Sequence, residues 1–527
     1  MSIALRNLEE KDLEAVHALV QSHVGPALSD SPLLQLETLK SCLLVDTAFT
    51  LVAEQEDRIL GMVAILMEQE TPETVLGLLG RFCVPETPDR QMVAESLVNT
   101  ALQSIQENLQ GCFAEIPSSN LWSQTACEQS GFIASGFLPR KLHSESHSGV
   151  VVYTYLNEKA RNARRPHPKI ISGAQDLAME VLKAHGIIYD VEIREDMVGC
   201  PIEGSLTVTP AEADVVRTIL QSRAPYDREV FNFFQNTQTS LHLACWPTQY
   251  IVAKEGERMV GVVGYIYNPL DKKVQITEMM ALEGEPQGFL MAHLIETLSQ
   301  EFAPDYWEAL VSAHAPRFQK TLDQLGFVCC AYLPAFALEH GLRSDALKMV
   351  KLNVGYETDT SQLTSTSKNI FSIIDIIFRE NSIGTAILKL LKDLRFFQGM
   401  GEGELRRVAR LFSQKLLRPE EVIFEAGSTG RELYVIERGE IEICTKDGNH
   451  LLGTIRTGEI LGEIAFLNGD PRTATAKSKS ATIVRVIHRK DFDRLIQREM
   501  HLGLIFFQNV AMDLADKLKH ADQAKSK

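Results

Sequence analysis

Residues 461–475 read Leu-Gly-Glu-Ile-Ala-Phe-Leu-Asn-Gly-Asp-Pro-Arg-Thr-Ala-Thr, and this stretch is the most informative in the chain. A strand is expected to end at Gly462, a carboxylate follows at Glu463, a short apolar helical turn comes next, and Arg472 lies nine residues after the carboxylate. The first N–H groups of a short helix point toward an anion, and an arginine can add a charge-assisted contact. A glycine lets the backbone come close to a ligand. The stretch therefore predicts an anion-binding turn.

The flanking sequence predicts a small all-β framework around this turn. Residues 422–443 contain short alternating strands with glycines at the turns, and residues 482–487 alternate as a closing strand. Two helical segments follow, over residues 489–498 and 502–520. Short strands separated by glycine turns are typical of a β-roll or jelly roll.

Residues 385–520 resemble the cyclic nucleotide-binding domain family, and the stretch 461–475 resembles its phosphate-binding cassette. Five glycines stand where this family has turn glycines: 427, 430, 439, 458 and 462. The resemblance implies cAMP or cGMP as a regulatory ligand. The residues that it places at the ligand are Gly462, Glu463, Ile464, Ala465, Arg472, Thr473 and Ala474.

The resemblance also implies a role for several of these side chains. Glu463 would accept a hydrogen bond from the ribose 2′-hydroxyl, and Arg472 would contact the cyclic phosphate. Thr473 is compatible with either purine, so the choice between cAMP and cGMP stays open. Phe506, Phe507 and Val510 are candidates for a lid over the base, although their spacing is also that of ordinary core residues. An alternative for Arg472 is a simple ion pair with Glu463 in a roll that binds nothing.

Composition narrows the remaining functions. The chain has 527 residues, enough for about three domains. Its net charge of −16 argues against a nucleic-acid partner. We find neither a long apolar run that would span a membrane nor an apolar signal sequence, and the nine scattered cysteines contain no C-x-x-C pair. These features predict a reduced, cytoplasmic protein without a metal site.

The first two-thirds of the chain contains an internal repeat. Residues 51–63 match residues 251–263 as a strand, a charged turn and a strand with a glycine, and residues 129–139 match residues 324–334 around a Gly-Phe pair. A third match, 5–20 with 206–221, opens each copy with a strand and an amphipathic helix. Three matches in the same order, each about 200 residues apart, indicate a duplication.

Each copy resembles the GCN5-related N-acetyltransferase (GNAT) fold. The predicted fold class is a multidomain α+β chain, with two tandem GNAT-like α/β domains before the β-roll. The expected parts are residues 1–157 (first copy), 158–204 (linker with a bridging helix), 205–354 (second, degenerate copy), 355–384 (hinge) and 385–527 (cyclic nucleotide-binding domain).

The GNAT resemblance implies acetyl-CoA as a cofactor, held by a loop before the long helix of a copy. In the first copy the equivalent residues are Arg90, Gln91, Met92, Val93 and Ala94. Met92 stands where a glycine is usual, and the second copy has Glu283 and Glu285 near the equivalent loop, which disfavour a pyrophosphate. We therefore expect CoA binding, if any, in the first copy.

The catalytic residues of such an enzyme are not evident. Cys127 is a candidate proton donor and Glu115 a candidate base. A small buried residue on a helix and an ordinary strand-end carboxylate are the simpler interpretations of these two positions.

Two functions remain open. The first is a cytosolic signalling protein whose C-terminal cAMP- or cGMP-binding domain regulates a tandem N-acetyltransferase module; acetylation of protein lysines from acetyl-CoA is one reaction that such a module could perform. The second is a non-catalytic regulator whose degenerate copies serve as an acyl-CoA sensor or a platform for a protein partner. The sequence leaves the acceptor, the oligomeric state and the direction of regulation open.

Overall fold

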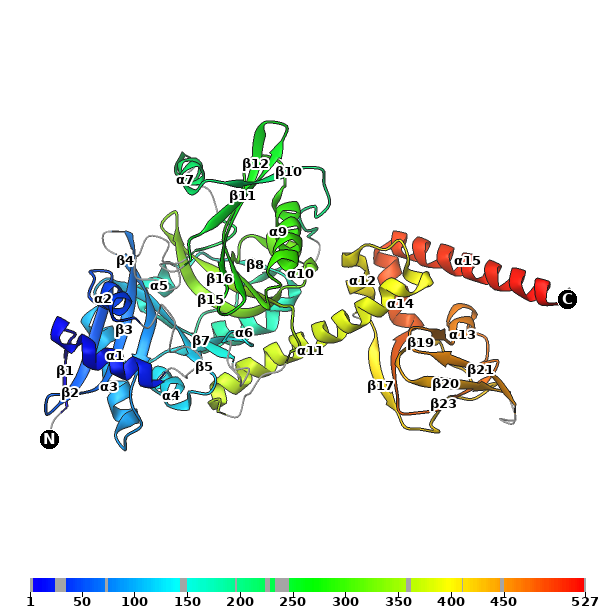
Figure 1. Cartoon of the computed structure of the whole chain (residues 1–527), viewed down its shortest axis with the longest axis horizontal. Helices are drawn as coiled ribbons and strands as arrows, with labels where there is room; N and C mark the ends of the chain where they lie inside the picture. The colour runs from blue at the N-terminus through cyan, green and yellow to red at the C-terminus, as the bar shows by residue number, and fades with distance from the viewer. Residues whose placement is uncertain are drawn as a thin grey trace. The chain divides into compact units, whose positions relative to one another are not determined.

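The structure, a computed structural model of the chain, divides into two compact units: an N-terminal unit, residues 1–377, and a C-terminal unit, residues 378–527 (Figure 1). It describes residues 3–23, 35–71, 74–142, 149–194, 197–222, 228–232, 246–356, 362–409, 411–445 and 450–525. No helix among these residues is both long and apolar enough to cross a membrane.

One continuous sheet of 14 strands forms the framework of the N-terminal unit. Its strands are β1 (Ala4–Asn7), β2 (Ala48–Gln55), β3 (Arg58–Thr71), β4 (Thr74–Cys83), β5 (Leu109–Pro117), β6 (Ile133–Leu138), β7 (Val150–Leu156), β10 (Thr207–Ala211), β11 (Gln249–Glu255), β12 (Arg258–Asn268), β13 (Lys273–Ala281), β14 (Tyr306–Ser312), β15 (Val328–Glu339) and β16 (Leu342–Leu352).

The order of these strands is the same when it is followed inward from either edge. From one edge it is β1-β2-β3-β4-β5-β7-β6, and from the other it is β10-β11-β12-β13-β14-β16-β15. Among the described strands of this sheet, β4–β5 and β13–β14 are the parallel pairs. We call strands β1–β7 the first half and strands β10–β16 the second half. This order agrees with the duplication that the three sequence matches indicate.

The two halves join where β6 pairs with β15, at Gly136 and Ala331. A Cβ on Gly136 would lie 2.2 Å from the Cβ of Ala331, closer than two carbon atoms that are not bonded to each other can approach. Glycine is therefore required here for a close approach of two backbones.

Helices cover the sheet of the N-terminal unit. They are α1 (Leu13–His23), α2 (Leu36–Leu43), α3 (Arg90–Ser104), α4 (Leu121–Gln129), α5 (Glu158–Asn162), α6 (Gln175–Ala184), α7 (Ala213–Ser222), α9 (Gln287–Glu301) and α10 (Pro316–Gln324), with 3₁₀ turns η1 (Glu10–Asp12) and η4 (Ser172–Ala174). The predicted bridging helix is present as α6, which contacts both β6 and β15 and buries Leu177 and Val181. A small parallel pair, β8 (Lys169–Ile170) and β9 (Glu192–Ile193), lies in the same linker.

The segment expected to be a hinge, residues 355–384, differs in part from that expectation. Its residues 357–361 lie outside the described residues, but helix α11 already begins at Ser365 and continues to Asp393, across the boundary between the units. Thr364 caps this helix, because its Oγ1 accepts from the N–H of Ser367 at 3.2 Å. The Thr364 hydroxyl also donates to Glu128 at 2.6 Å. The later part of the expected hinge, from Ser365 onward, is therefore helical.

The C-terminal unit contains the predicted β-roll, which is confirmed. One sheet has the order β17 (Ser413–Leu417), β24 (Thr482–His488), β19 (Glu432–Arg438), β22 (Ile460–Leu461), and the other β18 (Val422–Phe424), β23 (Thr475–Ser478), β20 (Glu440–Cys444), β21 (Leu451–Arg456). The core between them includes Tyr434, Ile436, Ile441 and Val484. The helical elements of this unit are η5 (Arg395–Phe397), α12 (Glu402–Ala409), α13 (Glu463–Asn468), α14 (Arg489–Arg498) and α15 (Met500–Lys525).

Candidate functional site

The cassette of the C-terminal unit is a strand, a glycine and one short helix. Strand β22 ends at Leu461, Gly462 follows in the left-handed region at φ 86°, and α13 begins at Glu463. The turn needs this glycine because L residues with a side chain rarely adopt such a φ. A second left-handed glycine, Gly469, ends the helix at φ 76°.

Arg472 folds back onto the start of this helix. Its side chain is almost fully buried, and its Nη1 donates to the carbonyl oxygen of Gly462 at 3.2 Å. Its Nη2 donates to Glu432, to the carbonyl oxygen at 3.0 Å and to the carboxylate at 2.9 Å. The structure therefore brings together Gly462, the start of α13 and the arginine that the sequence singled out.

Two aromatic rings flank the guanidinium of Arg472. Its central carbon lies 4.3 Å from the ring centre of Phe424 and 5.7 Å from that of Tyr434. Its Nε is buried and has no hydrogen-bond partner among the described residues. A buried donor without a partner costs free energy, so this N–H favours an incoming acceptor.

Glu432 is the residue of this site that the sequence analysis missed. It lies 40 positions before Arg472 and at the start of β19, so no local spacing connects the two residues. The alternative considered for Arg472 was an ion pair with Glu463. The ion pair that the structure describes for this arginine is the one with Glu432.

The other predicted ligand residues lie around the same turn. Ile464 and Thr473 are exposed, Gly462, Glu463 and Ala474 are half-buried, and Ala465 is buried. Of the three lid candidates, Phe506 and Val510 belong to the buried helical core, whereas Phe507 is 37% exposed. The interpretation as core residues therefore holds for Phe506 and Val510.

The residues predicted to hold acyl-CoA lie at the start of α3. Arg90 donates from its Nε to the carbonyl oxygen of Val84 at 2.9 Å, and its guanidinium carbon lies 4.2 Å from the ring centre of Trp122. Met92 is exposed, and Gln91 donates to Glu95 at 2.7 Å. Val93 and Ala94 are buried in the core. Arg90 is thus already engaged in packing within the unit.

The two catalytic candidates have different surroundings. Cys127 is fully buried on α4, and burial raises the pKa of its thiol. Glu115 lines a pocket, where its carboxylate lies 2.6 Å from Lys141 Nζ. Cys127 is not among the described residues that line this pocket. Within the described ranges, no group of three or more His, Cys, Asp or Glu residues is arranged to hold a metal ion.

Comparison with known proteins places the C-terminal site in a family. The sequence model described as cyclic nucleotide-binding domain matches residues 414–499. A cAMP-dependent protein kinase regulatory subunit of Yarrowia lipolytica is 28% identical over 106 residues, which is 20% of this chain and 28% of that protein. A cyclic nucleotide-gated channel of Caenorhabditis elegans is 29% identical over 107 residues, 19% of this chain and 15% of that protein.

A solved structure, the regulatory domain of Toxoplasma gondii PKA with cAMP, is 19% identical, covers 33% of this chain and 60% of its own, and has a TM-score of 0.24. The chain spans less than a third of the length of the two curated relatives. Residues 414–499 are thus a cyclic nucleotide-binding domain similar to those of kinase regulatory subunits and gated channels. The GNAT resemblance of the N-terminal unit stays a prediction.

Proposed function

We propose that the C-terminal unit binds cAMP or cGMP with the cyclic phosphate at Arg472, and that this binding regulates the N-terminal unit. The observation that carries the proposal is the buried guanidinium of Arg472, which faces the start of α13 and whose Nε–H has no partner among the described residues. A charge-assisted hydrogen bond to a phosphate oxygen would satisfy this donor.

Glu432 would set the orientation of the arginine before the ligand arrives. Its carboxylate and carbonyl oxygen both accept from Nη2, so the guanidinium plane is held in place. A pre-oriented arginine loses little conformational freedom on binding. Glu463 at the first position of α13 is the proposed acceptor for the ribose 2′-hydroxyl.

Regulation requires that the nucleotide bind two states of the chain with different affinity. Helix α11 begins in the N-terminal unit and ends in the C-terminal unit, so each unit contains one end of this helix. We propose that nucleotide binding acts on the N-terminal unit through this helix.

For the N-terminal unit, acyl transfer from acetyl-CoA and a non-catalytic role both remain proposals. Three observations favour the non-catalytic role: Arg90 is engaged by Val84 and Trp122, Met92 replaces a usual glycine, and Cys127 is buried. In that role the unit is an acyl-CoA sensor or a platform for a protein partner.

Calorimetric titration of cAMP and cGMP into the full chain tests the sensor. Arg472→Ala should remove a buried charged contact worth about 2–5 kcal/mol, which is a loss of roughly 30- to 5,000-fold in affinity. Arg456→Ala is the control, because the Arg456 side chain is 73% exposed and lies outside this site. No heat from either nucleotide at millimolar concentration, or equal affinity in both variants, would reject the proposal.

A thermal-shift measurement with acetyl-CoA tests the N-terminal unit. An acyltransferase or an acyl-CoA sensor must be stabilised by the ligand, since a ligand that binds only the folded state raises its stability. A pure platform gives no shift. An acetyl-transfer assay on a lysine peptide then separates the enzyme from the sensor.

A further inference from the structure

The N-terminal unit contains a pocket of about 170 Å³, called the cavity below, that strands of both halves of its sheet line. The lining side chains alternate along the strands, as Phe113 and Glu115 do on β5 and Glu308 and Leu310 do on β14. Residues two apart on a strand face the same side of a sheet. The cavity is therefore lined by one face of the continuous sheet, on strands of both halves, and it lies away from residues 90–94.

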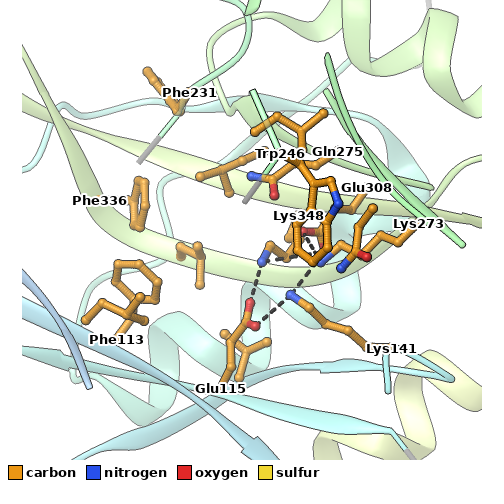
Figure 2. A pocket seen from close by; sticks show the side chains of 16 residues that line it. Phe113, Glu115, Lys141, Phe231, Trp246, Lys273, Gln275, Glu308, Phe336 and Lys348 are labelled. Atoms are coloured by element: carbon orange, nitrogen blue, oxygen red, sulfur yellow. Dashed lines mark hydrogen bonds and ion pairs between the residues drawn. The ribbon is translucent and has the colours of Figure 1, made fainter. Parts of the chain in front are cut away.

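Five charged side chains gather at one side of this cavity (Figure 2). Lys141 Nζ lies 2.6 Å from the Glu115 carboxylate and 3.1 Å from that of Glu308. Lys273 lies 3.0 Å from Glu308, and Lys348 lies 2.5 Å from Glu115. Among the described lining residues these five are the charged ones.

Both carboxylates of this cluster are ionised at neutral pH. Burial by itself would raise the pKa of Glu115, but Lys141 and Lys348 lower it to about 2. Burial likewise opposes ionisation of Glu308, yet Lys141 and Lys273 hold its pKa well below the ordinary value. Three ammonium groups thus face two carboxylates, and the cluster carries one excess positive charge in a largely buried place.

The opposite side of the cavity is aromatic. Phe336 lies with its ring centre 5.5 Å from that of Phe113 and 6.4 Å from that of Phe231. Figure 2 shows Phe113 and Phe336 facing the open space beside the charged cluster. For scale, an engineered apolar cavity of about 150 Å³ in another protein holds one benzene molecule.

We propose that this cavity binds a small organic monoanion, a carboxylate attached to an apolar body of about the size of one aromatic ring. The carboxylate lies among Lys141, Lys273 and Lys348 and neutralises the excess charge, and the apolar body packs against Phe113 and Phe336. Buried charge without a counter-charge is costly, so the site favours an anion over a neutral or cationic ligand. This site is independent of the proposed nucleotide site, since every residue that lines it belongs to the N-terminal unit.

The first experiment compares phenylacetate with its neutral amide, phenylacetamide, on the full chain. Binding is followed by tryptophan fluorescence, because Trp246 lines the cavity, and by the melting temperature. We expect phenylacetate to bind and to raise the melting temperature, and phenylacetamide to bind at least about tenfold more weakly, because a unit charge a few ångströms away is worth more than this factor. Equal binding of both compounds, or no binding of phenylacetate at millimolar concentration, overturns the proposal.

Two variants shift the charge of the cluster in opposite directions. Lys273→Gln balances the cluster at two positive and two negative groups, so phenylacetate affinity should fall roughly tenfold or more. Glu115→Gln leaves three positive groups and one negative group, so the affinity should rise. Glu283→Gln, at an exposed ion pair outside the cavity, is the matched control and should leave binding unchanged.

Affinities that do not move in opposite directions in the two variants overturn the assignment of the anion to this cluster. If one of the variants fails to fold, the comparison of the carboxylate with its amide on the unchanged chain still decides.

Discussion

The two halves of the N-terminal unit share one backbone frame but differ in the side chains that face the cavity. Asn157 follows the last strand of the first half, and its N–H donates to the carbonyl oxygen of Gln110 at 3.0 Å. Asn353 does the same in the second half, with Asp305 at 3.0 Å. Subtracting residue numbers gives offsets of 196 and 195, so equivalent positions can be identified strand by strand.

At some of these equivalent positions an apolar side chain in the first half corresponds to a charged side chain in the second half. Phe113 on β5 corresponds to Glu308 on β14, and Val152 on β7 corresponds to Lys348 on β16. The register of a sheet is set by its pattern of buried apolar residues and by its turns, so a change at a single position can leave the register unaltered. A duplicated sheet can therefore keep its frame while single equivalent positions, such as Phe113 and Glu308, differ between an apolar and a charged side chain.

The largest expected change in stability concerns Glu308, the charged counterpart of Phe113. Glu308 is 4% exposed and lies 3.1 Å from Lys141 and 3.0 Å from Lys273. Glu308→Gln leaves three lysines with a single carboxylate, so the free energy of unfolding should fall by about 3–5 kcal/mol. Urea unfolding followed by tryptophan fluorescence measures this, because Trp122, Trp246 and Trp307 all lie in the N-terminal unit.

The control is the equivalent position of the first half. Phe113→Leu keeps an apolar side chain there and should cost about 1–2 kcal/mol. If Glu308→Gln costs no more than Phe113→Leu, the charge at position 308 contributes no more to stability than the apolar side chain at the equivalent position 113.

The second effect is a loss of stability at rising pH that originates in the second half. Burial raises the pKa of Glu229 to about 7, while Gln287 and Arg317 oppose this rise. In the unfolded chain this carboxyl group ionises at the ordinary pKa of 4.5. Its contribution to the free energy of unfolding is therefore complete below pH 4.5 and decreases by at most about 3 kcal/mol as the pH rises to about 7. The melting temperature of Glu229→Gln, compared with the unchanged chain, should show a difference that grows across this window. A difference that stays constant with pH would contradict the assignment.

A third effect, of opposite sign, originates in the linker, where His185 packs against β7 of the first half. Burial and the charge of Arg161 lower the pKa of His185 to about 4, and its Nε2 lies 2.7 Å from the Thr154 hydroxyl on β7. The folded state keeps this ring neutral, whereas the unfolded chain takes up a proton near pH 6.5. The free energy of unfolding is therefore highest above pH 6.5 and falls by up to about 3 kcal/mol as the pH falls to about 4. His185→Gln should remove this loss in a melting series. If acid destabilises both proteins equally, His185 is not its source.

The smallest effect concerns the place where the halves meet. Gly136 and Ala331 are equivalent positions that pair with each other, and a Cβ on Gly136 would also lie 2.5 Å from the carbonyl oxygen of Cys330. Gly136→Ala should cost about 1–3 kcal/mol through overpacking. The double variant with Ala331→Gly has one methyl group at the junction, as the unchanged chain has, but on residue 136 instead of residue 331. It should recover part of the lost stability. Chemical unfolding of the single and double variants checks this, and no recovery would mean that the halves are not interchangeable at their junction.

The β-roll and its anion-binding turn could be predicted because their residues are close in the sequence. Gly462, Glu463 and Arg472 lie within eleven consecutive positions, so one short stretch determines the turn. Glu432 could not be predicted as the partner of Arg472, because β19 reaches the arginine only through the folded roll.

The cavity of the N-terminal unit could be predicted even less. Glu115 was visible as a carboxylate near a strand end, but its partners Lys141 and Lys348 come from segments 26 and 233 positions away. The repeat was evident from three matching segments, whereas the junction of β6 with β15 depends on how two complete halves pack. Pairing across such distances is decided by the tertiary fold rather than by local propensity.

Because β6 pairs with β15, the sheet of each copy is completed by the other copy. A fragment cut in the linker would expose the hydrogen-bonding edge of β6 or of β15 to solvent, and an open strand edge recruits another strand. The surface that best matches that edge is the same edge on a second fragment, turned end over end. The present chain thus has the geometry of a symmetric dimer whose two subunits were made into one polypeptide.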